Sequence, residues 1–577
     1  MGITITDPDE TINVFDDVNK PLLKKEIRIK VLNNIKDRVD NGDDTFYVFY
    51  AKPYSYNYPN LEASPFTVPA PTNALNEDLD IRKSITGLRK VRVTDIRKAF
   101  ERYNWTTGTV YSQYSNFVDL SEEDFYVYVQ DQKKVYVCLD NNNGAQSTIV
   151  PNSDDTNSFE TSDGYRWQLV IAYEDSLIRK FNSENYLPEP EPDSTQIKKA
   201  TKGGVIDRLD LADASPSFNY NAIEEIPFFI KGDGKEIASA EATIIPLNQV
   251  TFNGTLSTAD LQISKSGTGY FLDSNRSNKV PVEFRLKTEN LNAAQIAQSS
   301  DFELAYGLAT IDVDNNSVIA VEVKNIGNGY PSGATVVIVQ SSAIVYGTVN
   351  SDSPTPGIDF EIVEKGESYK TAKVISIFET SESIVPADDD IKVIVSPPEG
   401  HGGNIQNQLN STSLFINTRI NNDDDIFSTA NDFRQLGIIE NPTNTNGEKL
   451  SVDLLDTKLK IRIEADNATD FASLTEDLSL EGQLSLQKGI LIDVLDVEGQ
   501  PLQKDIRYVR DPLVSDTLSF IVGENLFVPD VNKVFTIRSV TDPNIDFSSG
   551  NILFINNTTE IDRNINQSET LNFIFNF

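Results

Sequence analysis

Histidine and cysteine, which often serve as acid–base groups and thiol nucleophiles, are scarce in this sequence. It contains one histidine, His401, in a Gly-rich loop, and one cysteine, Cys138, within an apolar run. A Ser-His-Asp arrangement would also need a positioned serine, and no Gly-x-Ser-x-Gly motif occurs. We therefore expect His401 to form hydrogen bonds at the surface, and Cys138 to be a small buried side chain.

Metal and phosphate motifs are also missing from the sequence. One histidine and one cysteine exclude zinc sites built from two histidines or several cysteines. No glycine-rich phosphate-binding loop occurs. The run that begins at Asp312 resembles the start of a calcium loop, but Ser317 replaces the glycine and Val323 the closing glutamate of an EF-hand. An acidic turn between two strands fits this run better, and we expect no metal and no cofactor.

Acidic residues dominate the charge. The chain has 87 acidic and 50 basic residues, which gives a net charge of −37. Phosphate contacts need basic patches, so nucleic acid is disfavoured as a partner. Glycosidases need only two carboxylates, but this many acids produce accidental pairs, and no pair can be nominated. We expect a structural or binding protein rather than an enzyme; a polysaccharide-degrading enzyme is the alternative that the carboxylates leave open.

The length of the chain and its hydropathy limit the number and kind of domains that we expect. At 577 residues, three or four domains are expected. No apolar run reaches transmembrane length, so membrane insertion is not expected. The first residues lack a secretory signal pattern. Gly2 and Thr6 match the short myristoylation pattern, but alternating isoleucines before Pro8 indicate an edge strand.

The predicted fold class is mainly β, a β-rich α+β protein with few helices. Residues 21–39 predict an amphipathic helix, with Ile27, Val31, Ile35 and Val39 as its apolar stripe. Most later segments are strand-like runs separated by polar turns. The run 187–193, with its alternating prolines and acids, predicts a stiff spacer or a surface-hugging loop, and we place the first domain boundary there.

Two turns that carry the only tryptophans each open into a β-type run. We expect them to belong to one discontinuous β-sandwich-like core with an N-terminal helix, from which two inserted β-domains emerge. Gly164 permits a sharp turn before a strand, and tryptophan rings are good core anchors. The expected anchors of this core are Trp105, Gly164, Tyr165, Trp167, Phe433, Arg434, Phe575 and Phe577.

A weak repeat runs through the middle of the chain. Each copy has the pattern apolar-x-apolar-x-x-x-Gly-x-x-Tyr, which predicts a short strand, a glycine bend and an aromatic plug, followed by another apolar strand. The spacing is too uneven for a solenoid. The repeat positions are Gly267 and Tyr270, Gly327 and Tyr330, and Gly366 and Tyr369.

These signals predict five segments. Residues 1–195 form the N-terminal part of the core, and residues 196–395 form one or two inserted β-domains with the Gly-Tyr repeats. Residues 396–449 return to the core, residues 450–545 form a second inserted β-domain, and residues 546–577 supply the last core strands.

Several aromatic and turn motifs occur in a fixed order along the chain. They are Phe46 to Tyr54, Val91 to Val93, Arg102 to Trp105, Tyr136 to Asp140, Ser162 to Trp167, Phe433 to Pro442, Ile552 to Asn556 and Glu569 to Phe577. In this order they resemble the baseplate wedge proteins of T-even-like contractile-tailed bacteriophages, the products of gene eight. The resemblance covers roughly residues 1–190, 396–445 and 546–577, and the remaining segments resemble insertions.

The resemblance implies a non-enzymatic virion protein of the tail baseplate, assembled in the host cytoplasm. It implies a β-rich homodimer that binds neighbouring wedge proteins, with peripheral tail-fibre connectors as further partners. It also implies a part in coupling baseplate rearrangement to sheath contraction. The alternative is a receptor- or glycan-binding tail adhesin, in which Tyr270, Tyr330 and Tyr369 would supply aromatic surfaces.

Overall fold

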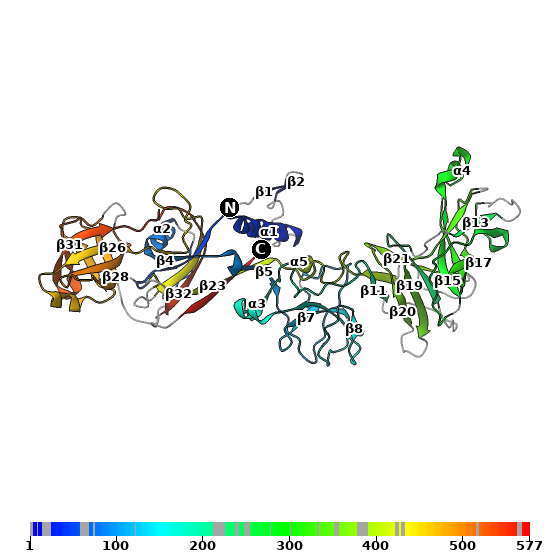
Figure 1. Ribbon diagram of the computed structural model, residues 1–577, viewed down its shortest axis with the longest axis horizontal. Coiled ribbons are helices and arrows are strands. Elements are labelled where there is room, and N and C mark those ends of the chain that lie inside the picture. Colours follow the sequence, from blue (N-terminus) through cyan, green and yellow to red (C-terminus); the bar gives the residue numbers. More distant parts are fainter. Residues whose placement is uncertain are drawn as a thin grey trace. The chain divides into compact units, whose positions relative to one another are not determined.

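A computed structural model describes residues 4–7, 10–13, 25–57, 68–72, 75–121, 123–211, 226–236, 242–246, 254–276, 278–299, 302–331, 334–350, 357–377, 391–421, 426–427, 433–514, 519–561 and 568–577. Strands dominate the described residues, as predicted (Figure 1). The chain divides into two compact units. The first comprises Met1–Phe100, Arg179–Ser183 and Thr412–Phe577, and the second comprises Glu101–Ile178 and Glu184–Ser411.

The first unit contains a five-stranded sheet built from distant parts of the sequence. Its order is β25-β4-β3-β24-β32, and its paired neighbours run antiparallel. In strand β24, which is paired on both sides, Ile438 lies opposite Val48 of β3 and Phe554 of β32. The strands are β3 (Phe46–Ala51), β4 (Ile85–Lys90), β24 (Phe433–Glu440), β25 (Leu454–Asp456) and β32 (Asn551–Ile561).

Three further strands of this unit pair in the same discontinuous way. They are β5 (Ile96–Glu101), β23 (Ser413–Ile420) and β33 (Glu569–Asn576). Ile416 of β23 lies opposite Ile96 of β5 and Phe573 of β33. The beginning and the end of the chain therefore meet through strands from the middle, and the final strand is paired along its whole length.

The two sheets and one helix enclose a common core. Val48 and Ile438 of the first sheet, Ile416 and Phe573 of the second, and Leu32 of α1 (Lys25–Asp40) belong to one buried cluster. Two sheets packed through their apolar faces make a sandwich. The expected sandwich-like core with an N-terminal helix is thus present in the first unit.

The buried stripe of α1 differs from the predicted one. The structure buries Leu32, Lys36 and Val39, whereas Ile27 and Val31 are half-exposed. An α-helix has 3.6 residues per turn, so a strict four-residue repeat drifts about 40° with each step. The predicted line of residues therefore winds away from the core toward the helix N-terminus.

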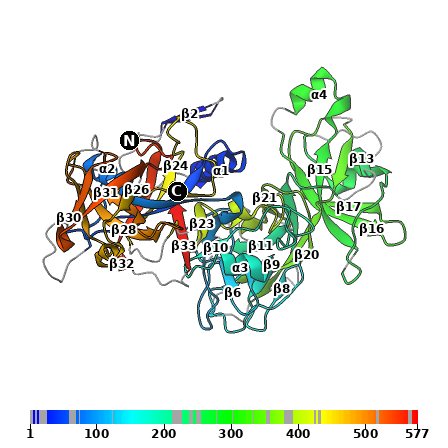
Figure 2. The ribbon, with the colours of Figure 1, turned by 60° about the vertical axis from the view of Figure 1, so that its left-hand side comes forward.

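The remaining strands of the first unit form a small hairpin and a closed barrel. The hairpin pairs β1 (Thr4–Asp7) with β2 (Glu10–Asn13), while Gly2 lies outside the described residues. The barrel order is β26-β29-β28-β27-β30-β31. Figure 2 labels β26, β28, β30 and β31 of this barrel. Its strands are β26 (Leu459–Glu464), β27 (Ser479–Gly482), β28 (Lys488–Asp496), β29 (Gln503–Arg510), β30 (Asn525–Val528) and β31 (Lys533–Thr541), and α2 (Leu75–Ser84) also belongs to this unit.

The described residues of the second unit form three sheets. Their orders are β6-β7-β9-β8, β11-β22-β21-β12-β19-β20 and β14-β13-β18-β15-β16-β17. The first sheet consists of β6 (Tyr126–Val129), β7 (Lys134–Asp140), β8 (Phe159–Glu160) and β9 (Arg166–Ala172). It includes the hairpin of β6 and β7.

The two six-stranded sheets occupy the region of the Gly-Tyr repeats. One consists of β11 (Ile206–Leu211), β12 (Ile226–Gly232), β19 (Ala343–Asn350), β20 (Gly357–Lys365), β21 (Ala372–Ser376) and β22 (Ile391–Val395). The other consists of β13 (Ala242–Pro246), β14 (Leu261–Lys265), β15 (Lys279–Leu286), β16 (Ala305–Asp312), β17 (Ser317–Asn325) and β18 (Val336–Val339). Short elements are α3 (Asp175–Lys180), β10 (Tyr186–Pro188), α4 (Ala293–Gln298) and α5 (Ile405–Gln408).

The predicted spacer at 187–193 is not a free linker where it begins. Leu187, Pro188 and Glu189 are buried, and the Tyr173 hydroxyl donates a hydrogen bond to the Pro188 carbonyl at 2.8 Å. Only its acidic end, from Glu191 onward, is exposed. The chain passes between the two units near residues 100, 178, 183 and 411, so this segment begins shortly after one of these boundaries. Alternating prolines therefore mark a packed extended segment here, because proline suits extended backbone in either setting.

Replacement of Phe433 by alanine tests the core of the first unit. The Phe433 ring stacks on Tyr50 with centroids 3.8 Å apart, which ties β24 to β3. We expect a loss of about 3–5 kcal/mol in the free energy of unfolding of this unit. Amide hydrogen exchange in β3 and β24 measures it, with Leu553→Ala, at a half-exposed site on β32, as the control. Equal protection in both variants would contradict the packing role.

Candidate functional site

His401 lies inside the second unit, not at its surface. It is 1% exposed, and both of its ring nitrogens have partners. Nε2 lies 2.8 Å from the Asp207 carboxylate, and Nδ1 lies 2.6 Å from the Gln408 side-chain amide. Tyr114 packs against the ring edge-on at 4.9 Å. The expectation of a surface histidine is therefore wrong.

Glycines explain why this loop turns inward. Gly400 and Gly402 have φ of +81° and +77°, a region that other residues rarely adopt. A Cβ at these positions would lie 2.7 Å from the Lys202 carbonyl and 2.4 Å from the Lys198 carbonyl. The loop can therefore approach the 198–202 backbone closely, and that approach encloses His401. The sequence shows the glycines, but not what they approach.

The cluster around His401 ties sheets together. Asp207 lies on β11, and its backbone carbonyl accepts a hydrogen bond from Arg166 of β9 at 2.6 Å. The next residue, Arg208, donates to the backbone carbonyls of Leu139 and Tyr114. Burial, with the nearby Asp207 charge as a smaller cause, raises the pKa of Tyr114 well above its ordinary value. These contacts fix β11 against the first sheet of this unit.

The arrangement does not assemble a catalytic triad. A Ser-His-Asp site needs one imidazole nitrogen directed at a nucleophile while the other contacts the carboxylate. Here the nitrogen opposite Asp207 is directed at Gln408, which is not a nucleophile. The geometry is that of a buried polar network that positions backbone segments.

No sequence motif predicted a second polar pair in this unit. Lys365 Nζ lies 2.9 Å from Ser158 Oγ, although 207 positions separate the two residues. Burial lowers the pKa of Lys365, and Arg166 acts in the same sense while Asp207 opposes it. Serine beside such a lysine occurs in Ser-Lys hydrolases, but catalysis would also need oxyanion donors and a substrate pocket. The hydrogen bond links β20 to the segment before β8, and this structural role explains the pair.

Asp163 organises the tryptophan-bearing turn. Its carboxylate accepts hydrogen bonds from the backbone N–H groups of Thr148 at 2.7 Å and Ile149 at 2.9 Å, and from the Thr161 hydroxyl at 2.5 Å. Burial alone would raise the pKa of Asp163, but these hydrogen bonds hold it below its usual value. The carboxylate thus acts as a staple between two loops.

Tryptophan and its neighbours fill a small core beside this turn. Gly164 has φ of +83°, as a sharp turn requires. Tyr165 stacks on Trp167 with centroids 5.3 Å apart, and both are fully buried, while Trp105 packs against the same cluster. These four anchors belong to the second unit. They therefore do not anchor the core that contains the C-terminal strands, because they pack together in a separate cluster.

The other four predicted anchors lie in the first unit. Phe433 is buried, and Arg434 forms an ion pair with Glu560 at 2.6 Å. Phe575 and Phe577 are half-buried and pack at the edge of the core cluster. The eight anchors thus divide evenly between the two units.

The three Gly-Tyr repeats share one local geometry. In each, the glycine has a positive φ, and so does the residue two positions later, just before the tyrosine. Tyr270, Tyr330 and Tyr369 are each at most 2% exposed. The positive φ values are +63° and +82° at Gly267 and Gly269, +59° and +78° at Gly327 and Gly329, and +65° and +68° at Gly366 and Ser368.

The repeat tyrosines bind backbone through their hydroxyl groups. Tyr270 donates to the Ile338 carbonyl at 2.7 Å. Tyr330 donates to the Phe284 carbonyl at 2.5 Å and accepts from the Ala305 N–H at 2.8 Å. Each ring thus acts as an aromatic plug in the core, with its hydroxyl group bonded inside the sheet region. None of these rings faces solvent, as a sugar-binding platform would require.

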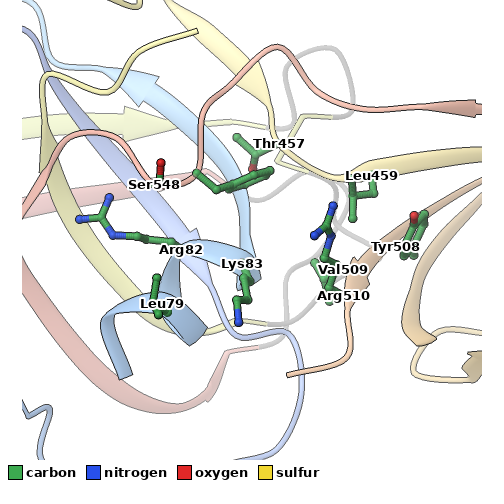
Figure 3. Close-up of a pocket in the computed structure, with 10 residues that line it drawn as sticks. Leu79, Arg82, Lys83, Thr457, Leu459, Tyr508, Val509, Arg510 and Ser548 are labelled. Atoms are coloured by element: carbon green, nitrogen blue, oxygen red, sulfur yellow. The ribbon is translucent and has the colours of Figure 1, made fainter. Parts of the chain in front are cut away.

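The first unit has a pocket of about 170 Å³ where the barrel joins the core (Figure 3). Arg82 of α2 is held by Asp78 at 2.7 Å and by the Gly550 carbonyl at 3.0 Å. The described lining contains three basic residues, of which Arg82 and Lys83 already pair with Asp78 and Asp80 of the same helix. The lining residues are Leu79, Arg82, Lys83, Thr457, Leu459, Tyr508, Val509, Arg510, Phe547 and Ser548.

Within the described ranges, no group of three or more His, Cys, Asp or Glu side chains is placed to hold a metal ion. None of the helices in those ranges combines the length and the apolar character that a bilayer crossing requires. Asp312 and Ser317 end β16 and begin β17, so the calcium-like run is a turn between strands. Comparison of the chain with protein-family models and with curated protein sequences gave no match.

Replacement of His401 by leucine tests the buried network. The variant leaves the Asp207 charge buried without its partner, which costs about 3–5 kcal/mol. Both tryptophans lie in the second unit, so denaturant unfolding followed by tryptophan fluorescence reports on that unit alone. We expect Asp207→Asn/His401→Leu to be more stable than His401→Leu, because no unpaired charge remains. A double variant no more stable than the single one would show that charge is not the cause.

Replacement of Tyr330 by phenylalanine tests the repeats. It leaves the Ala305 N–H and the Phe284 carbonyl without this hydroxyl, at a cost of about 1–3 kcal/mol. We expect faster hydrogen exchange at the Ala305 amide. Tyr270→Phe is the matched control, because Tyr270 bonds elsewhere and should leave that amide protected. Unchanged exchange in Tyr330→Phe would refute the plug function.

Proposed function

We propose that this chain is a structural component of a contractile-tail baseplate wedge. In this role it is a homodimer in the virion that links neighbouring wedge proteins and transmits the rearrangement that precedes sheath contraction. The observation that carries the proposal is the discontinuous scaffold, in which β24 pairs with β3 and β32. These three strands come from motifs that resemble the gene-eight family in the same order.

The insertions support the same proposal. The barrel begins and ends with neighbouring strands, since Ile461 of β26 lies opposite Val540 of β31. The region of the Gly-Tyr repeats does the same, with Leu209 of β11 opposite Val393 of β22. A module whose entry and exit are adjacent can be inserted without disturbing its host. Such modules give a subunit additional contact surfaces, which a multi-protein assembly needs.

The adhesin alternative loses the feature that motivated it. It depended on exposed aromatic rings in the repeats, and Tyr270, Tyr330 and Tyr369 are buried. Tyr369 places its hydroxyl 2.5 Å from Ser341 Oγ, inside the sheet region. A structural subunit therefore fits the repeats better than a glycan receptor.

Purified tails provide the test of this function. We expect the chain in tails at a fixed stoichiometry with other wedge proteins, measured by quantitative mass spectrometry. We also expect a solution mass of about twice the chain for the free protein, because C2 dimers are the commonest assembly. Phage that lack the gene should form no complete baseplates. Normal, contractile tails without this chain would refute the proposal.

A further inference from the structure

Two loops of the barrel expose aliphatic side chains side by side. One joins β27 to β28, and the other precedes β30. Leu484 and Leu486 on the first loop are 73% and 70% exposed, and Ile521 and Val522 on the second are 50% and 61% exposed. We name these four residues the barrel tip. Residues 483–487 and 519–523 contain no charged residue, in a chain whose residues are 24% charged.

A buried carboxylate holds the two loops together. Glu524 is 1% exposed. It accepts hydrogen bonds from the backbone N–H groups of Leu484 and Ser485 at 2.9 Å each, and of Ile521 at 2.6 Å, and from the Ser485 hydroxyl at 2.8 Å. Burial alone would raise the pKa of Glu524, but these donors lower it. The loops are therefore pre-organised rather than loose.

Leu486 adopts a backbone conformation that leucine normally avoids. Its φ is +60°, and among the described non-glycine residues with positive φ it is the one aliphatic side chain. Glycine or asparagine would relieve this strain. Strain of this kind persists where the surrounding structure imposes it, and it often occurs at ligand contacts. A strained and exposed leucine indicates that its outward side chain has a use.

We propose that the barrel tip docks into an apolar pocket on a different protein of the assembly. The inference rests on the proposed function and names a contact surface for it. Convex aliphatic loops need a concave apolar partner, and the neighbouring exposed charges, Glu481 and Lys488, already pair with each other. Pre-organised loops bind without an ordering cost.

Area and charge argue against the other occupants. The tip presents a few hundred Å², whereas a stable interface buries about 800 Å² on each partner. The tip alone therefore cannot hold two copies together. The chain carries a net charge of −37. The same charge opposes an anionic lipid surface. One apolar contact among several in a larger assembly fits these values.

Thiol labelling of single-cysteine variants tests the tip. Cys138 is buried, so a maleimide should modify only an introduced cysteine. We expect Leu484→Cys to react in the free protein and to be protected at least tenfold in purified tails. Leu502→Cys is the control, because Leu502 is 44% exposed on the β28–β29 connection and should react equally in both. Gln483→Cys keeps all four aliphatic residues and should also be protected.

The outcomes separate the inference from the proposed function. Mass spectrometry of tails first shows whether the chain is present, and its absence would refute the proposed function and this docking with it. If the chain is present, and Leu484→Cys and Gln483→Cys react in tails as fast as in the free protein, the docking of the barrel tip is refuted. The proposed function then stands. A bismaleimide cross-link between two Leu486→Cys chains would assign the tip to a second copy, and protection by phosphatidylcholine vesicles alone would assign it to lipid; both results overturn the proposal.

Discussion

Pairing on both edges of β24 is the constraint on which the first unit depends. A buried strand must satisfy its backbone donors and acceptors, and β24 does so with β3 on one side and β32 on the other. Gly437 allows this close pairing, since a Cβ there would lie 2.4 Å from the Phe554 carbonyl and 2.5 Å from the Phe49 ring. Segments from the start, the middle and the end of the chain must therefore fold together.

This constraint also determines where insertions can be accommodated. Material added within β24 or its partners would break the ladder, so it enters between strands. The barrel lies between β25 and β32, and its first and last strands pair with each other. The Lys458 ammonium, at the barrel entrance, is fully buried and binds the Ile426 carbonyl at 2.8 Å and Asp456 at 3.0 Å. The barrel is thus tied to the rest of the first unit by polar contacts at the point where it begins.

Features of the fold that depend only on neighbouring residues could be predicted from sequence patterns. Alternation along β26 is typical of a half-buried strand, and Leu459, Ile461 and Ile463 are buried while the residues between them are partly exposed. The Gly-x-x-Tyr spacing predicted bends and aromatic plugs, which the structure contains. The positions of His401, and of Ser158 beside Lys365, could not be predicted, because each depends on which distant segment lies opposite. A glycine in the sequence shows that backbone can approach closely, but not which backbone does so.

Composition is also limited as a guide to the surface, since it counts every acid as if it were solvated. Asp163 and Glu524 are instead acceptors for backbone N–H groups inside turns, where they replace missing ladder bonds. Asp493 is buried and forms an ion pair with Arg507 at 3.6 Å, so this carboxyl contributes little to the surface field. The acidic surface is therefore less uniform than the formal charge suggests. An uncharged apolar patch on such a surface stands out as a place where acidic repulsion is weakest and a partner can approach.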